Sequence, residues 1–203
     1  MKKLLTLCFL AFGLIARAQT SGYAVGDIVS DFSLRNIDSK MISMADYKEA
    51  KGFIVVFTCN TCPYSNAYED RINELNKNYQ AKGYPVIAIN PNDPVSQPGD
   101  SFDKMRARAK SKNYSFPYLA DPDHKVTRNF GASRTPHVFV LQKTSKGNIV
   151  RYIGAIDNDT ENTSSNKSEY VQNAVDALLA GNKPGLSFTK AVGCTIKWKK
   201  TQG

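Results

Sequence analysis

Runs of apolar residues alternate with segments of helical spacing in the middle of the chain. Residues 53–57 form a continuous aromatic and β-branched run, which predicts a strand buried on both faces. Apolar residues then recur every three or four positions from Tyr64 to Tyr79, as on one face of a helix of about four turns. A second apolar run covers residues 85–89. The segment 53–89 is therefore predicted to be a β-α-β unit with parallel strands and a right-handed crossover.

The rest of the chain predicts further strands and helices. Residues 90–99 contain three prolines and are expected to be irregular. The other expected elements are, in chain order, a strand at 31–34, a basic helix at 101–112, an extended piece at 116–119, a helix at 123–130, strands at 137–141 and 149–153, a helix at 170–180 and a tail from 182. No internal repeat is visible, so residues 19–203 are predicted to form a single α/β domain.

Residues 1–18 predict a secretory signal peptide. Two lysines form a short basic region, residues 4–15 are apolar, and Ala16-Arg17-Ala18 fits a small-x-small cleavage site. Cleavage there would leave Gln19 as the mature N-terminus of a periplasmic or extracellular protein. The alternative, an uncleaved anchor, is disfavoured because the apolar stretch is short. No later apolar run approaches the length of a membrane span, so we expect no stable membrane insertion after cleavage.

The charge of the chain is moderately basic. The 203 residues carry a formal net charge of +9, and 41% of them are hydrophobic, which suits a globular domain with a substantial core. Removing Lys2, Lys3 and Arg17 with the signal peptide would leave +6. The excess is spread along the chain, and aromatic residues are not interleaved with a basic stripe. We therefore expect a solvated basic surface and no nucleic acid partner.

The segment Cys59-Asn60-Thr61-Cys62 lies at the predicted junction of strand and helix. The unpaired N–H groups and the positive end of the helix favour a thiolate there, as in a redox dithiol. Half of a zinc site is a second interpretation, but zinc needs about four ligands, and the mature chain adds only Cys194, His124 and His137, at no recognised spacing. A structural disulfide is the third, although so small a loop constrains the unfolded chain little. The redox dithiol is favoured, and an oxidising compartment suits it.

Four segments carry a family resemblance, and they are 57–64 (FTCNTCPY), 88–93 (AINPND), 134–137 (RTPH) and 193–198 (GCTIKW). They closely resemble the secreted redoxin-domain proteins called peroxiredoxin-like, and the order of predicted elements is similar to that of the thioredoxin superfamily. The resemblance covers most of residues 25–200. It implies a thioredoxin-like α/β fold, in which a central mixed sheet is flanked by helices and carries an N-terminal strand extension and a C-terminal tail.

The resemblance also implies roles for the matching residues. Cys59 would be the exposed nucleophile that attacks a substrate disulfide, and Cys62 would resolve the mixed disulfide. Thr135-Pro136 would be a cis peptide that faces the cysteines and offers backbone groups to the substrate chain, whereas an ordinary turn before a strand is the alternative. The partner would be a dithiol or disulfide protein, and we expect no cofactor and no metal.

Several positions depart from the best-known patterns of the superfamily. Thr58 and Asn60-Thr61 stand where thioredoxins usually have Trp and Gly-Pro, and the intervening pair tunes the redox potential, so the direction of electron flow stays open. A thiol peroxidase is the alternative enzyme. Peroxiredoxins place a Thr three residues before their peroxidatic Cys, whereas Thr58 lies four residues before Cys62. Arg134 or Arg151 would supply the cation for that chemistry, although surface or edge-strand charges are the plainer interpretation.

Three groups of residues carry secondary hypotheses. Cys194 is either a buried apolar residue of the tail, which we favour, or a third redox thiol. Cys59, Cys62 and His137 would be the ligands of a copper-binding assembly protein, which is the non-enzymatic alternative. The acidic residues at 157–161 are similar to those of a calcium-binding loop, but the segment lacks the glycine and the final glutamate of that loop, so a solvated loop is favoured. The leading hypothesis is an exported thiol–disulfide oxidoreductase, whose oligomeric state the sequence does not predict.

Overall fold

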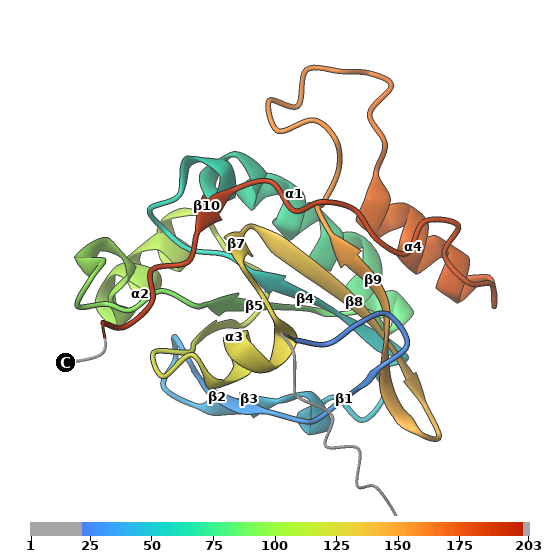
Figure 1. The fold of residues 1–203 in the computed structure, drawn as a ribbon, viewed down its shortest axis with the longest axis horizontal. Coiled ribbons are helices and arrows are strands. Elements are labelled where there is room, and N and C mark those ends of the chain that lie inside the picture. Colours follow the sequence, from blue (N-terminus) through green and yellow to red (C-terminus); the bar gives the residue numbers. More distant parts are fainter. Residues whose placement is uncertain (1–21, 201–203) are drawn as a thin grey trace, which may run out of the picture.

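A computed structural model describes residues 22–200, and the predicted signal peptide lies outside the described residues. The strands are β1 Ile28–Val29, β2 Ser33–Asn36, β3 Met41–Ser43, β4 Gly52–Phe57, β5 Val86–Asn90, β6 Tyr118–Ala120, β7 Arg134–Thr135, β8 His137–Thr144, β9 Gly147–Gly154 and β10 Cys194–Thr195. Eight of them form one mixed sheet in the order β1-β9-β8-β4-β5-β6-β2-β3 (Figure 1). The two remaining strands, β7 and β10, pair with each other.

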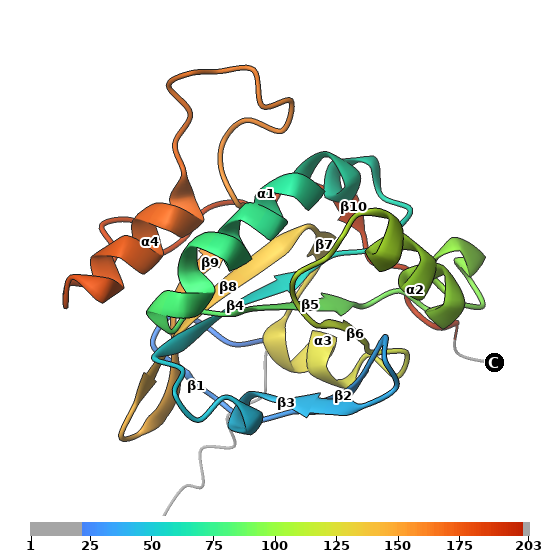
Figure 2. The ribbon, with the colours of Figure 1, turned by 180° about the vertical axis from the view of Figure 1, so that it is seen from behind.

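Helices cover both faces of this sheet. The α-helices are α1 Pro63–Tyr79, α2 Phe102–Ser111, α3 Lys125–Phe130 and α4 Tyr170–Leu179, and short 3-10 turns span Met44–Asp46, Gln80–Lys82 and Pro98–Asp100. In both views α1, α2 and α4 lie on one face of the sheet and α3 lies on the other (Figures 1 and 2). Within residues 22–200, no helix combines the length and the apolar character that a membrane crossing requires.

The predicted β-α-β unit is confirmed at the centre of the sheet. β4 pairs in parallel with β5 and antiparallel with β8, so both of its edges are covered. Its side chains alternate between the two layers, since Ile54 and Val56 pack towards α1, α2 and α4, while Val55 and Phe57 pack towards α3. Each such side chain stabilises the fold by about 1.5–3 kcal/mol when fully buried. The continuous apolar run therefore reflects a strand without a solvent-facing side.

The outer strands have boundaries in the structure that differ from the predicted ones. The strand expected at 31–34 begins at Ser33, the extended piece expected at 116–119 becomes the strand from Tyr118, and β3 is not indicated by the sequence pattern. Their register depends on distant partners. For example, Oδ1 of Asn36 accepts the N–H of Tyr118 at 2.9 Å, across 82 residues of chain. Local alternation carries no information about such pairings, so the boundaries of these strands could not be placed from sequence.

The C-terminal tail runs from α4 past α1 and on towards α2, with β10 inside it (Figures 1 and 2). The alternation predicted for the tail is confirmed only in part, because Ile196 is buried, Cys194 is half-buried and Trp198 is 40% exposed. The ring of Trp198 packs against that of His124, with centroids 4.9 Å apart. The tail therefore contacts the fold at separate points, which are the parallel bridge of Phe188 with Ile153, the strand β10 and the ring of Trp198, and it is not a strand of the main sheet.

Candidate active site

The two cysteines of the C-x-x-C segment lie where β4 ends and α1 begins. The N–H of Thr58 extends the β4–β5 ladder by donating to the carbonyl of Ile89 at 2.9 Å. Cys62 is the N-cap residue of α1, and Pro63 is the first helical residue. Proline suits that position because the first helical N–H has no partner within the helix. The positive end of the helix dipole therefore lies at Cys62, where it favours a thiolate.

A buried carboxylate, Asp100, holds the loop between the two cysteines. Its Oδ1 accepts the N–H of Asn60 at 2.7 Å. Its Oδ2 accepts the hydroxyl of Thr61 at 2.8 Å and the amide of Asn92 at 2.7 Å. The hydroxyl of Tyr118 donates to Oδ1 of Asn60 at 3.0 Å, which completes the clamp. Because Asp100 is only 2% exposed, these charge-assisted bonds act in a surrounding of low dielectric and are strong.

Sequence reasoning missed Asp100 and its partners. Asp100 lies 40 residues from Asn60 along the chain, beyond the irregular stretch 90–99. The only available signal is an acidic residue at the end of a proline-rich segment, next to the predicted helix at 101–112. That signal is typical of many solvated loops, so it could not have singled out a residue that positions the redox loop.

Thr135 faces both sulfurs. The Thr135–Pro136 bond is cis, as the resemblance implies. Sγ of Cys59 lies 3.3 Å from Oγ1 of Thr135, and the thiol of Cys62 donates to the carbonyl of Thr135 at 3.0 Å. One residue thus contacts both cysteines, through its side chain and through its main chain.

The chain's own tail covers the main chain of Thr135. In the antiparallel pair of β7 and β10, Cys194 lies opposite Thr135 and Thr195 lies opposite Arg134. A Cβ atom on Gly193 would overlap with the carbonyl oxygen of Thr135, so only glycine permits this close approach. The backbone edge that the resemblance assigns to a substrate chain is therefore occupied by β10.

Both sulfurs of the pair are withdrawn from solvent. Cys59 is 3% exposed and Cys62 is 2% exposed, so the expectation of an exposed Cys59 is wrong. Interaction with the Cys59 thiol lowers the pKa of Cys62, and the Cys194 thiol and the N–H of Ser65 lower it further, against the opposing effect of burial. Interaction with Cys62, then burial, then the carboxylate of Asp100 raise the pKa of Cys59. Of the two thiols, Cys62 is therefore the one that ionises more readily, while the bond that it donates to the carbonyl of Thr135 belongs to its protonated form.

Cys194 belongs to the same cluster. It is half-buried rather than buried, which departs from the interpretation favoured by the sequence pattern. Burial, and then interaction with Cys62, raise the pKa of the Cys194 thiol to about 11. Since Cys194 also lies opposite Thr135 in the β7–β10 pair, the three cysteines of residues 22–200 meet around Thr135.

The other auxiliary residues do not bind the sulfurs. Thr58 is buried, and its main chain serves the β4–β5 ladder. Nη1 of Arg134 donates to the carbonyl of Gly193 at 3.3 Å, and Nε of Arg151 donates to Oε1 of Gln142 at 2.8 Å. Among the hydrogen bonds of the described residues, none joins either arginine to a cysteine. The cation expected for peroxide chemistry is therefore not in contact with the thiols.

The proposed copper ligands do not assemble into a site. His137 is buried, with its ring centroid 4.8 Å from that of Phe139, and burial lowers its pKa to about 4. Its Nδ1 accepts the N–H of Ser133 at 3.4 Å. Within residues 22–200, no group of three or more His, Cys, Asp or Glu side chains is arranged to hold a metal ion. The geometry thus offers no copper site to Cys59, Cys62 and His137.

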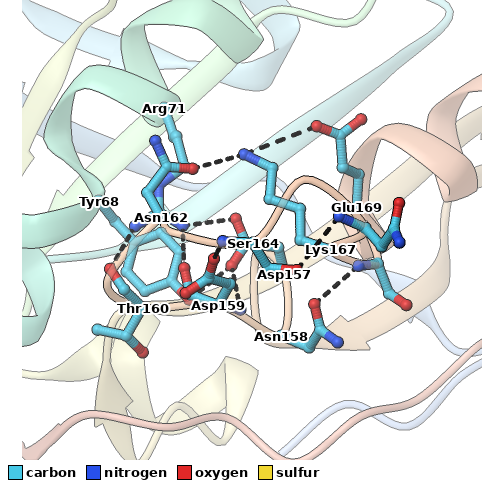
Figure 3. A network of polar contacts seen from close by, with 12 residues as sticks. Tyr68, Arg71, Asp157, Asn158, Asp159, Thr160, Asn162, Ser164, Lys167 and Glu169 are labelled. Atoms are coloured by element: carbon cyan, nitrogen blue, oxygen red, sulfur yellow. Dashed lines mark hydrogen bonds and ion pairs between the residues drawn. The ribbon is translucent and has the colours of Figure 1, made fainter.

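An arginine side chain binds the acidic segment that is similar to a calcium-binding loop. Nη1 of Arg71, from α1, lies 2.6 Å from Oδ2 of Asp157, and both side chains are buried (Figure 3). The hydroxyl of Tyr68 also donates to Oδ1 of Asp157, at 2.8 Å. Further along, Oδ2 of Asp159 accepts the N–H of Ser164 at 2.6 Å. The segment expected to be a solvated loop is therefore anchored to α1 by a buried ion pair.

Comparison with known proteins places these features in a family. The model of the AhpC/TSA family matches residues 25–153, which include the C-x-x-C segment and Thr135-Pro136. The thiol-disulfide oxidoreductase ResA of Geobacillus thermodenitrificans is 26% identical over 145 residues, which cover 70% of this chain and 79% of that protein. A Mycobacterium tuberculosis protein that bears a peroxiredoxin name is 23% identical over 141 residues, which cover 70% of this chain and 83% of its own.

A solved structure resembles nearly the whole chain. The crystal structure of a hypothetical protein from Sinorhizobium meliloti 1021 matches with a TM-score of 0.81 at 27% identity. The match covers 89% of this chain and 97% of that one, so it extends beyond the segment of the family model. With its thioredoxin-like fold, the chain belongs to the AhpC/TSA family and is a redoxin-domain protein of the thioredoxin superfamily.

Proposed function

We propose that the protein is an exported thiol–disulfide oxidoreductase that uses Cys59 and Cys62 on the disulfides or dithiols of a partner protein. The observation that carries the proposal is the approach of both sulfurs to Thr135, at 3.3 Å from its Oγ1 and 3.0 Å from its carbonyl oxygen. Two thiols that share one small residue need little movement to close a disulfide. The ResA relative, a thiol-disulfide oxidoreductase by name, supports the same class of activity.

The exchange balances without a cofactor. A thiolate of the pair displaces one sulfur of the partner's disulfide and forms a mixed disulfide, and the released partner sulfur takes up a proton. The second thiol of the pair then loses its proton, attacks the mixed disulfide and closes the Cys59–Cys62 bond, so that the pair is oxidised and the partner is reduced. The resemblance implies that Cys59 attacks first. The charge arrangement favours Cys62 as the first thiolate, because the helix N-terminus lies at Cys62 and Asp100 opposes charge on Cys59.

Variants of the two cysteines test the proposal. The reduced protein is mixed with a disulfide-bonded protein such as insulin, and release of thiols is followed over time. The double variant Cys59→Ser/Cys62→Ser should abolish multiple turnover, because the single thiol that remains at Cys194 cannot close the bond that releases the partner. Full turnover by this double variant would overturn the proposal. Equilibration with glutathione buffers then gives the direction of electron flow. A redox potential of about −270 mV suits a reductant, and one of about −120 mV suits an oxidant.

Export is part of the proposal and rests on the basic, apolar and small-residue pattern of residues 1–18. Outside the cytoplasm, the pair would exchange with a partner that supplies or removes electrons. Mass spectrometry of the chain purified from the exported fraction should find Gln19 as the first residue. A chain that retains residues 1–18 and stays with the cytoplasmic fraction would contradict export and leave the exchange chemistry untouched.

A thiol peroxidase is the second candidate, supported by the family match and by the Mycobacterium tuberculosis relative. Two observations favour exchange over peroxide reduction. Arg134 and Arg151 bond elsewhere, and the ionised group that bears on Cys59 is the carboxylate of Asp100, which disfavours a thiolate there. Adding hydrogen peroxide to the reduced protein separates the two functions. Rapid peroxide loss that depends on Cys59 would support the peroxidase, and slow loss equal to that of Cys59→Ser would remove it.

A further inference from the structure

Cys62 is the middle sulfur of three. It interacts with the thiol of Cys59 on one side and with that of Cys194 on the other. The backbone supports this order, because Cys62 donates to the carbonyl of Thr135 and Cys194 is the residue opposite Thr135 in the β7–β10 pair. Residues directly opposite in an antiparallel pair have Cα atoms about 4.5–5.5 Å apart. Thr135 thus holds Cys194 at the cysteine pair through main-chain geometry.

The three sulfurs differ in their access to solvent. Cys59 and Cys62 are almost completely buried, whereas Cys194 is half-buried. A sulfur of a large partner must reach the sulfur with which it exchanges, because the attack is a direct displacement. Of the three cysteines in the described part of the chain, Cys194 is therefore the one that a partner reaches most easily.

The segment around Cys194 is held firmly against the site. On its C-terminal side, the N–H of Lys197 donates to Oδ1 of Asn92 at 2.9 Å, and the N–H of Asp93 donates to the carbonyl of Lys197 at 2.8 Å. On its N-terminal side, the N–H of Thr189 donates to the carbonyl of Ile153 at 2.9 Å. A thiol held in this way has a high effective concentration at its neighbour, well above that of a free thiol.

We propose that Cys194 is a third redox thiol, which exchanges a disulfide with Cys62 and carries it between the buried Cys59–Cys62 pair and the partner protein. This inference rests on the proposed function, since it needs a Cys59–Cys62 disulfide to exchange. It assigns a catalytic role to a tail residue that lies outside the segment matched by the family model.

The internal step is a thiol–disulfide exchange within the chain, with no net oxidation or reduction. Cys194 loses its proton to water, and its thiolate attacks Sγ of Cys62 in the Cys59–Cys62 disulfide. The Cys62–Cys194 bond forms, the Cys59–Cys62 bond breaks, and Cys59 leaves as a thiolate that takes up a proton. One thiolate of a partner dithiol then attacks Sγ of the more accessible Cys194, which forms a mixed disulfide and releases Cys62. The second partner thiol attacks the mixed disulfide and releases Cys194, so the partner becomes a disulfide and all three cysteines are reduced. The reverse sequence reduces a partner disulfide.

The charges of the cluster favour this order of events. In the reduced protein, burial and then interaction with Cys62 raise the pKa of Cys194, which keeps Cys194 protonated. When Cys62 enters a disulfide it can no longer ionise, so that contribution to the raised pKa of Cys194 disappears. Cys194 therefore becomes a better nucleophile in the oxidised protein, the state in which the relay needs it.

Peptide mapping tests the new bond directly. Trypsin releases Cys59 and Cys62 together in the peptide 52–71 and Cys194 in the peptide 191–197. A Cys59–Cys62 disulfide stays within one peptide, whereas a Cys62–Cys194 disulfide joins the two. After oxidation of the Cys59→Ser variant, alkylation of free thiols and digestion without reductant, we expect the joined pair to be the main product at every protein concentration. Free, alkylated Cys62 and Cys194 would overturn the proposal.

A second variant separates this proposal from the proposed function. Cys194→Ser should still form the Cys59–Cys62 disulfide with a small oxidant, but it should exchange that disulfide with a protein dithiol much more slowly than the wild type. Thr195→Ser, on the same strand with an exposed side chain, is the matched control and should exchange at the wild-type rate. Wild-type rates in Cys194→Ser would overturn the relay and leave the proposed function standing. If every cysteine variant exchanged at the wild-type rate, both the relay and the proposed function would be overturned.

Discussion

Oδ1 of Asp100 accepts the N–H of Asn60 at 2.7 Å, so a buried carboxylate fixes the backbone between the two cysteines. The same carboxylate raises the pKa of Cys59, although burial and the neighbouring Cys62 act more strongly. Asp100 therefore couples the shape of the redox loop to the distribution of charge within the pair. Its negative charge faces the first cysteine, while the positive end of α1 lies at the second.

Replacing Asp100 should change both properties. Asp100→Asn removes charge-assisted bonds, each worth about 1.5–3 kcal/mol, so we expect the free energy of unfolding to fall by roughly that amount. The pKa of Cys59 should fall as well, because a neighbouring negative charge is gone. Urea unfolding and a pH titration of thiol alkylation, resolved by peptide mapping, measure the two effects. Asp103→Asn, whose side chain is 92% exposed, is the control and should leave both values unchanged.

Gly193 should not tolerate a side chain. In Gly193→Ala, the new Cβ overlaps with the carbonyl oxygen of Thr135, so β10 must shift away from β7. Overpacking of this kind costs about 1–3 kcal/mol. Gly185→Ala lies in the same tail with no atom within 4 Å of the added carbon, so it should be nearly neutral. Limited proteolysis of the tail and urea unfolding compare the variants, and equal resistance of the two would contradict the close contact.

The buried ion pair between Arg71 and Asp157 should be essential for stability. Arg71→Met leaves the carboxylate of Asp157 buried without its partner, which costs about 3–5 kcal/mol. The control is Glu169→Gln, which loses a partly exposed pair with Lys167 and should cost less than about 1 kcal/mol. Thermal and urea unfolding measure both variants. A loss below about 1 kcal/mol in Arg71→Met would show that the loop at 157–161 is held by other contacts.

Stability should depend on pH through His137. Burial lowers the pKa of His137 to about 4 in the folded protein, from an ordinary value of 6.5. Below pH 6.5 the unfolded chain therefore binds a proton that the folded protein does not, so stability falls as the pH drops towards 4 and levels off below it. The full effect is roughly 3 kcal/mol.

His137→Phe isolates this contribution. Phenylalanine retains an aromatic ring beside Phe139 and has no proton to bind, so the part of the acid loss due to His137 should disappear. Unfolding free energies at several pH values between 4 and 7 give the comparison. Identical acid dependence in the wild type and the variant would show that other groups cause it.

Local pattern was enough for the centre of the fold and for the position of the redox pair. The apolar run 53–57 predicts β4, and apolar positions at helical spacing after Cys62 predict α1. Both signals are local, because a strand covered on both faces and a helix with one buried face leave their periodicity in consecutive residues. A C-x-x-C segment at that junction then follows from the sequence alone.

Tertiary structure decided what surrounds the pair. Asp100, Thr135 and Cys194 come from three separate segments, and each reaches the cysteines through a contact across at least about 39 residues of chain. It also decided that Cys59 is buried, that the tail covers Thr135 and that Arg71 occupies the acidic loop. Burial and long-range partners depend on the packing of the whole chain, whereas the sequence by itself determines only periodicity and residue type. The pair and Cys194 are therefore visible in the sequence, whereas the charges of the pair, its access to solvent and the position of Cys194 beside it are visible only in the fold.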